Sequence, residues 1–169
     1  FNPAKWKPIR PNSAFANLTD RDGYWAAKII TAFSDQHLEA IVAEAKYRDP
    51  AAAEFMTRAL AERRDMIGRY YFDRVPPLDF FSTREETLSF VDLGVERELY
   101  DPETTRYRTR WKLDSGGGWS EWTETDMTTH AWAKGTQVRF QWQVSRGEGW
   151  SSTTEVVVAA SGQVVSLKR

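Results

Sequence analysis

The hydrophobic period of the chain changes at a pair of prolines, and this change limits the folds available to it. Before Pro76 and Pro77 the apolar residues recur at helical spacing, whereas after them they alternate with polar residues, as in a β-strand. Proline lacks a backbone N–H and clashes with the preceding helical turn, so a helix cannot continue through this pair. We therefore predict an α+β chain, with an N-terminal three-helix segment followed by an antiparallel β-sandwich.

Three helix starts are marked by capping residues. Thr19 and Ser34 each precede an apolar stripe at helical spacing, and Asp49 is followed by Pro50. Such side-chain oxygens accept hydrogen bonds from the free N–H groups of a first turn, and proline suits the first helical position. The third helix is expected to run to about Phe72. The predicted organisation is an extended linker or strap at 1–17, a three-helix segment at 18–76 and a β-sandwich at 77–169.

The strands are predicted from alternation and from turn residues. In the clearest strand, Tyr107, Thr109, Trp111 and Leu113 alternate with basic residues. We expect Trp111 and Trp142 to lie on the apolar faces of their strands and to build the core. The expected strands are a mixed segment at 87–100, 106–113, a return strand at 119–126 after a glycine turn, 138–144, 152–160 and 163–168.

The stretch from 107 to 152 resembles part of a fibronectin type III domain. The residues that carry the resemblance lie at 107–113, 119–123, 135–144 and 147–151. The resemblance implies a fibronectin type III- or immunoglobulin-like sandwich over about residues 78–169, with 107–113 as its third strand and the strand beginning at Val138 as its sixth. Two features depart from the family: Val138 stands where a corner tyrosine is usual, and 163–168 would be an extra strand.

The helical part carries a second resemblance. The runs at 25–29, 47–52 and 62–69 look like a segment near the C-terminus of larger, uncharacterised bacterial proteins. This similarity implies no activity. It leads us to expect that the chain is the C-terminal part of a larger bacterial protein. Separately, we expect an extracellular or periplasmic location.

Composition and charge exclude several classes of function. The formal net charge is −1, so no overall field draws the chain to nucleic acid. The sequence has no cysteine, which removes disulfides, thiol nucleophiles and cysteine-based zinc sites. No apolar run approaches the roughly 20 residues that a membrane helix requires. We expect no nucleic-acid partner, no membrane span, no metal and no cofactor.

The tryptophans suggest a carbohydrate-binding alternative. Six of the eight lie in the β half, and flat aromatic rings can stack on a sugar ring. Trp122 and Trp150 stand near glycine-rich turns among polar neighbours, so they are the candidates for exposed binding residues. Exposed aromatic side chains are also common without any such role.

The basic residues of the 106–113 strand form a stripe that could meet an anionic glycan or phosphate. If Leu113 paired with Trp119, however, Arg108 would fall opposite Glu124, Arg106 opposite Asp126 and Arg110 opposite Trp122. The basic residues would then be engaged in charge pairs and an Arg–Trp contact. Each pair would stabilise the sheet by about 0.2–1 kcal/mol. We keep Arg108 and Arg110 as candidate binding residues, although a solvated sheet face is the simpler interpretation.

The titratable residues give no catalytic signature. His37 is expected on the surface, in the first turn of the second helix. His130 has Glu121, Glu124 and Asp126 nearby, a grouping that could bind metal or move protons, but its spacing matches no known ligand pattern. The same carboxylates could serve glycoside hydrolysis if two lay about 5–10 Å apart. We predict no catalytic residue.

The third helix carries two arginines beside its apolar stripe. Arg63 and Arg64 could contact another domain or a partner through their guanidinium groups. Alternatively, their aliphatic stems cover the edge of the helical core.

Taken together, these patterns favour a non-catalytic interaction or scaffolding segment. Its expected partner is another domain of the parent chain or a separate protein, with a glycan as a further possibility. The alternative is a carbohydrate-binding module or, more remotely, an accessory or catalytic domain of a glycoside hydrolase.

Overall fold

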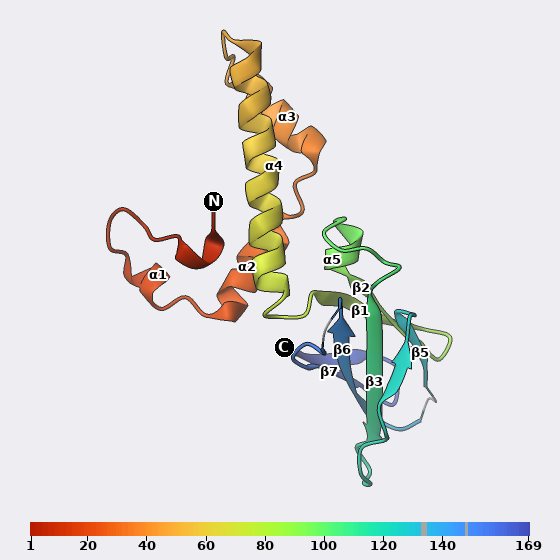
Figure 1. The fold of residues 1–169 in the computed structure, drawn as a ribbon. Coiled ribbons are helices and arrows are strands. Elements are labelled where there is room, and N and C mark those ends of the chain that lie inside the picture. Colours follow the sequence, from red (N-terminus) through yellow and green to blue (C-terminus); the bar gives the residue numbers. More distant parts are fainter. Residues whose placement is uncertain (133–134, 148) are drawn as a thin grey trace. The chain divides into compact units, whose positions relative to one another are not determined.

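The change of period at the proline pair coincides with a division in the structure. The computed structural model describes residues 1–132, 135–147 and 149–169. The chain separates into two units, Phe1–Arg74 and Val75–Arg169. The first is helical and the second is built from antiparallel strands, which confirms the α+β class (Figure 1).

The three predicted helices are present and begin at the predicted caps. Thr19 accepts a hydrogen bond from the backbone N–H of Asp22, and Ser34 accepts one from that of His37. Asp49 caps the third helix, which starts at Pro50. The helical elements are η1 (Pro3–Lys5), α1 (Ser13–Ala16), α2 (Asp20–Ile30), α3 (Asp35–Glu44) and α4 (Pro50–Phe72). Within the described parts of the chain, no helix is both long and apolar enough to cross a membrane.

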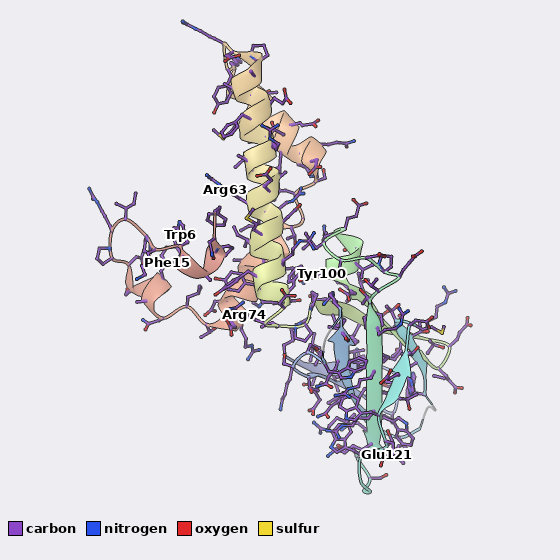
Figure 2. The ribbon with its side chains drawn as sticks, viewed as in Figure 1. Trp6, Phe15, Arg63, Arg74, Tyr100 and Glu121 are labelled. Atoms are coloured by element: carbon purple, nitrogen blue, oxygen red, sulfur yellow. The ribbon has the colours of Figure 1, made fainter. Side chains whose placement is uncertain are left out.

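The segment 1–17, predicted as an extended linker or strap, contains two short helices that were not predicted from the sequence. Asn2 and Asn12 each accept a bond from a backbone N–H two residues later and start the short helices η1 and α1. The rings of Trp6 and Phe15 meet edge to face, with centroids 5.2 Å apart (Figure 2). These asparagine caps act locally, so they need no helical period in the flanking residues.

Helix α4 is the element against which α2 and α3 pack (Figure 1). At its crossing with α2 only glycine fits, because a Cβ on Gly23 would lie 1.9 Å from the ring of Tyr71. The fully or nearly buried apolar side chains of this unit are Tyr24, Ala27, Leu38, Val42 and Phe72. The small number of such residues indicates a thin helical core.

The second unit contains two antiparallel sheets, consistent with the predicted β-sandwich. Its described elements are β1 (Leu78–Arg84), β2 (Thr87–Asp92), α5 (Leu93–Glu96), β3 (Arg106–Leu113), β4 (Thr123–Thr125), β5 (Thr129–Ala131), β6 (Val138–Ser145), β7 (Thr154–Val158) and β8 (Val164–Lys168). One sheet has the order β1-β2-β5 and the other the order β4-β3-β6-β7-β8. Glu148, in the segment that carries the family resemblance, lies outside the described residues.

A single apolar core joins the two sheets. Leu88 and Phe90 of β2 pack against residues of β3, β6 and β7, with Trp142 of β6 fully buried at the centre. The ring of Phe90 meets those of Tyr107 and Trp142 at centroid distances of 5.4 and 4.8 Å. The strict alternation of buried and half-buried residues along β6 matches a strand with one face in the core.

Three strand predictions need correction. The segment 87–100 is a strand only to Asp92, whose carboxylate accepts bonds from the N–H groups of Gly94 and Val95 and so starts α5. The return strand predicted at 119–126 is regular only over β4. Before it, Ser120 rather than Trp119 bonds the backbone of β3, at Trp111. Strand β5 was not predicted, because three residues are too short for an alternation to be recognised.

Trp111 does not belong to the core, and that prediction was also wrong. It lies on the same face of β3 as the buried Tyr107 and Thr109, yet 40% of its surface is exposed. It lines a small cavity of about 350 Å³ together with His130, Trp132 and Phe140. The opposing strand β5 is short, so the inner face of β3 is left partly uncovered towards its C-terminal end.

The sheets are also linked by a buried carboxylate at the end of β2. Both oxygens of Asp92 lie 2.7 Å from a guanidinium nitrogen of Arg146, and Tyr107 donates its hydroxyl to the same carboxylate at 3.0 Å. The Asp92 side chain is only 2% exposed. We call Asp92, Tyr107 and Arg146 the inter-sheet clamp, because β2 belongs to one sheet and β3 to the other.

Asp92→Ala should lower the free energy of unfolding of the sandwich by about 3–5 kcal/mol, since it leaves the Arg146 charge buried without its partner. Asp126→Ala, at an exposed position, should change it by no more than about 0.5 kcal/mol. Urea denaturation followed by tryptophan emission measures both. Equal stabilities for the two variants would contradict the role given to the clamp.

The clamp also predicts a pH dependence. Burial, the nearby Asp92 charge and the hydrogen bond to it all raise the pKa of Tyr107 above its usual value. The unfolded chain therefore loses this proton near pH 10, while the folded chain keeps it, so stability is full below pH 10 and falls above it by about 1.4 kcal/mol per pH unit. The slope of unfolding free energy against pH above 10 should be shallower by that amount in Tyr107→Phe; equal slopes would be inconsistent with a buried, protonated Tyr107.

Candidate binding surface

The basic residues of β3 lie on the outer face of its sheet. Tyr107 and Thr109 point into the core and are almost fully buried. The alternation of a strand therefore places Arg108, Arg110 and Lys112 on the opposite, outer face. The two arginine side chains are half-buried rather than fully solvated.

Tryptophan rings alternate with these cations. The Arg108 guanidinium carbon lies 4.5 Å from the ring centroid of Trp150 and 4.6 Å from that of Trp122. The Arg110 guanidinium carbon lies 4.7 Å from Trp122 and 5.0 Å from Trp119. Lys112 continues the series, with its Nζ 4.9 Å from Trp119. We call these six residues the arginine–tryptophan ladder.

Strand geometry explains why the series alternates. Side chains two residues apart on one face of a strand are separated by about 6.6 Å. That distance is close to twice the contact distance of about 3.5 Å between stacked carbon atoms, so one flat indole fits between successive guanidinium groups. The Trp122 ring is within cation–π distance of both Arg108 and Arg110. Each cation–π contact stabilises the surface by about 0.5–2 kcal/mol, depending on exposure.

Glutamines of β6 hold the two arginines in place. Arg108 donates its Nε–H to Oε1 of Gln143 at 2.7 Å, and Arg110 donates its Nε–H to Oε1 of Gln141 at 2.9 Å. Gln143 in turn donates to the carbonyl of Ser151 at 2.9 Å. The strand pairing sets these contacts, because Arg108 lies opposite Gln143 and Arg110 opposite Gln141 in the β3–β6 ladder.

The structure unites all four candidate binding residues of the β half. Arg108, Arg110, Trp122 and Trp150 are all members of the arginine–tryptophan ladder. The predicted register of Arg108 opposite Glu124 is confirmed, as is the Arg110–Trp122 contact. Arg106 differs from expectation, since it donates to the carbonyls of Glu103 and Thr105 instead of pairing with Asp126.

Sequence reasoning missed part of this surface. Trp119 was not proposed as a binding residue, Lys112 was considered only as part of the basic stripe, and the anchoring role of Gln141 and Gln143 was not foreseen. The signal was present in the alternation of β6, which places its glutamines on the same outer face as the β3 arginines. Trp150 could not be assigned a neighbour from sequence, because it reaches Arg108 from a turn more than forty residues downstream.

The ladder leaves little of Trp122 for sugar stacking. A pyranose ring needs an open aromatic face, and the indole of Trp122 already contacts two guanidinium groups. Trp150 has a cation contact with Arg108 alone. The geometry therefore suits recognition through the N–H groups of the arginines better than stacking of a sugar on an indole ring.

The histidine–carboxylate grouping considered from the sequence does not come together. His130 packs edge to face on Phe140 and Trp142, at centroid distances of 5.4 and 6.2 Å, on the core side of the sandwich. Glu124 is exposed and lies opposite Arg108, whose side chain is on the outer face. Burial lowers the pKa of His130, which favours the neutral ring at pH 7. Within the described ranges, no group of three acidic, histidine or cysteine side chains could hold a metal ion.

His37 and Arg64 have local partners in the helical unit. His37 is exposed, and its Nδ1 accepts the backbone N–H of Ser34 at 3.1 Å. Arg64 lies 2.8 Å from carboxylate oxygens of both Asp35 and Asp65 and donates to the carbonyl of Phe33. These bonds join α4 to the start of α3.

Arg63 lies beside a groove of the helical unit. Its guanidinium carbon is 5.8 Å from the ring centroid of Phe1. The groove has a volume of about 1040 Å³, and Trp6, Phe15 and Tyr71 are among its lining residues. Figure 2 labels Trp6, Phe15 and Arg63. Both candidate partner-contact residues of α4 therefore have neighbours within the helical unit itself.

Comparisons with known proteins assign no family. No protein-family model matches the chain, and no curated protein matches it. The function must therefore be argued from the surfaces described above.

Trp122→Ala should lower the free energy of unfolding of the sandwich by about 2 kcal/mol, because it removes two cation–π contacts at a half-buried ring. Met127→Ala, which truncates a side chain that is 59% exposed, is the matched control and should have little effect. Urea denaturation followed by far-ultraviolet circular dichroism avoids the change in tryptophan emission. A Trp122→Ala variant as stable as wild type would show that the ladder does not stabilise the fold.

Proposed function

We propose that this chain is a non-catalytic interaction or scaffolding segment that contacts its partner through the arginine–tryptophan ladder. The observation that carries the proposal is the fixed arrangement of Arg108 and Arg110 between indole rings on an outer sheet face. Arginine and tryptophan are the residue types most enriched where binding energy concentrates in protein interfaces. Held side chains lose little further freedom on binding, which favours affinity.

The proposal includes a fibronectin type III-like fold for the second unit. Support comes from the strand order, since β3 and β6 are the two strands that carry the family resemblance and they are neighbours in one sheet. Immunoglobulin-like sandwiches pair their third and sixth strands in this way. Strand β8, added beyond β7, is a feature of this chain.

The wider setting is part of the same proposal. The helical runs at 25–29, 47–52 and 62–69 look like a segment near the C-terminus of larger bacterial proteins. On that basis the segment belongs to a longer chain, and its partner is another domain of that chain or a separate protein. The proposal further includes a location outside the cytoplasm. A carbohydrate-binding role is the weaker candidate, because it depends on the free faces of Trp122 and Trp150.

Site-specific photocrosslinking in the source cells tests this proposal. A crosslinking amino acid at Glu121, an exposed position next to Trp122, should yield a covalent partner or an internal crosslink to another domain (Figure 2). The same group at Val165 on β8, at the other edge of the sheet, should not. The parent band on the same blot should run well above 19.5 kDa and fractionate outside the cytoplasm.

Two results would count against the proposal. One is crosslinking of equal strength at both positions, which would indicate contact without a defined surface. The other is loss of biological activity in His130→Ala with folding intact, which would point to chemistry at His130 instead. A normal phenotype for His130→Ala is the expected result, because that ring packs on the core side.

A further inference from the structure

We infer that the arginine–tryptophan ladder binds an extended acidic peptide segment of its partner, with carboxylates two residues apart meeting Arg108 and Arg110. This inference rests on the proposed interaction function and specifies the chemistry of the partner. Three observations support it. The two arginines have no ion-pair partner among the described residues, their terminal N–H groups are left to bind a ligand, and their side chains are two residues apart on one strand face.

The two arginines lack carboxylate partners. The other arginines of the sandwich that are held by hydrogen bonds mostly have them: Arg139 pairs with Asp114 and Glu155, Arg146 with Asp92, and Arg169 with Asp79. Among the described residues, neither Arg108 nor Arg110 forms an ion pair. In the part of the chain that the structure describes, neither guanidinium group therefore has a carboxylate within ion-pair distance, although both side chains are half-buried.

The residues that hold the arginines preserve this charge. Gln143 and Gln141 accept the Nε–H bonds through neutral amide oxygens. A glutamate at either position could accept the same bond but would neutralise the guanidinium. Glu124, opposite Arg108 in the strand register, is exposed and makes no ion pair with it. The surface thus combines ordered cations with neutral anchors.

The terminal nitrogens of each guanidinium group are the donors left for a ligand. Each guanidinium carbon lies within 5.0 Å of the centroids of two indole rings, and each Nε–H is bonded to a glutamine. A guanidinium carries five N–H donors, so those on the two terminal nitrogens remain. They lie in the plane of the group, where a carboxylate is bound with two parallel hydrogen bonds.

The spacing of the arginines matches an extended peptide. Arg108 and Arg110 are two residues apart on one strand face, a separation of about 6.6 Å. An extended peptide presents every second side chain on one face at the same repeat. Two acidic residues separated by one other residue can therefore meet both guanidinium groups, and a third can approach Lys112.

Overall charge favours a short acidic segment over a long polyanion. The sandwich, residues 75–169, has eleven Lys or Arg and fourteen Asp or Glu side chains, a net charge of −3. Nucleic acid or a sulfated polysaccharide would extend over this negative surface and be repelled. A peptide that contacts two or three side chains responds mainly to the local pair of positive charges.

The test is a titration of the whole chain with short synthetic peptides, followed by tryptophan emission and calorimetry. In the first, the alternating peptide, two glutamates are separated by one serine; an isomer of the same composition places the two glutamates next to each other, and a third peptide replaces both glutamates by glutamine. The alternating peptide should bind at least about tenfold more tightly than the isomer, because only it presents two carboxylates on one face, and each charged hydrogen-bonded contact is worth about a factor of ten. The glutamine peptide should not bind.

Variants assign the effect to the ladder. Arg110→Gln should weaken binding of the alternating peptide about tenfold. Arg84→Gln removes the same charge from an arginine whose side chain is 91% exposed and should change binding by less than about twofold. Glu124→Gln should strengthen binding, since it removes the carboxylate opposite Arg108. This last substitution is at an exposed position, so the test does not depend on whether Arg110→Gln folds.

Several results would overturn the inference. Equal affinity for the two glutamate isomers would show that spacing is not recognised. Tighter binding of a single-stranded oligonucleotide or a sulfated oligosaccharide of equal charge would identify a polyanion surface instead. No binding of any acidic peptide, with a partner still captured by crosslinking at Glu121, would leave the interaction function standing and reject the acidic partner.

Discussion

The sandwich depends on one buried carboxylate. Removing an ionised carboxylate from water is costly unless several groups compensate it. Asp92 has four such partners: Arg146, the hydroxyl of Tyr107 and the backbone N–H groups of Gly94 and Val95. These groups come from β3, from α5 and from the segment after β6. Because their bonds form together only when both sheets are in place, the clamp specifies one arrangement of the sheets over alternatives of similar apolar packing.

The close packing around Asp92 also restricts its neighbours. The Arg146 guanidinium carbon lies 3.9 Å from the ring centroid of Tyr100, and a Cβ on Gly94 would come within 2.8 Å of both Tyr100 and Arg146. Glycine is therefore required at the first turn of α5. The N–H of Gly94 in α5 and the ring of Tyr100, which follows that helix, both contact the Asp92–Arg146 ion pair.

The register set by the clamp determines what the outer face carries. With Tyr107 bonded to Asp92 in the core, Arg108 and Arg110 must point outward, because successive residues of a strand alternate between faces. A slip of one residue would bury two arginines and expose the core residues of β3. The arginine–tryptophan ladder is thus a consequence of the same constraint that closes the sandwich.

Much of the fold could be predicted because its signals are local. The capping residues Thr19, Ser34 and Asp49 and the alternation of β3 and β6 each act within a few residues. Two features that could not be predicted, the exposure of Trp111 and the neighbour of Trp150, depend on distant parts of the chain. Alternation places Trp111 on the inner face, but its exposure depends on how far β5 extends over it. The candidate binding residues could be named, whereas the contact of Arg108 with Trp150 could not, since it requires the β3–β6 register and the following turn.

The ladder differs from an ordinary basic patch in its rigidity. A solvated arginine has about 2 kcal/mol of side-chain conformational entropy, which it loses when a ligand fixes it. In Arg108 and Arg110 the indole contacts and the glutamine bonds already fix the side chains in the free protein. Folding therefore bears this entropic cost, and a partner gains the hydrogen bonds without it. Such preorganisation gives discrimination by spacing, because rigid donors cannot move to meet carboxylates at another separation.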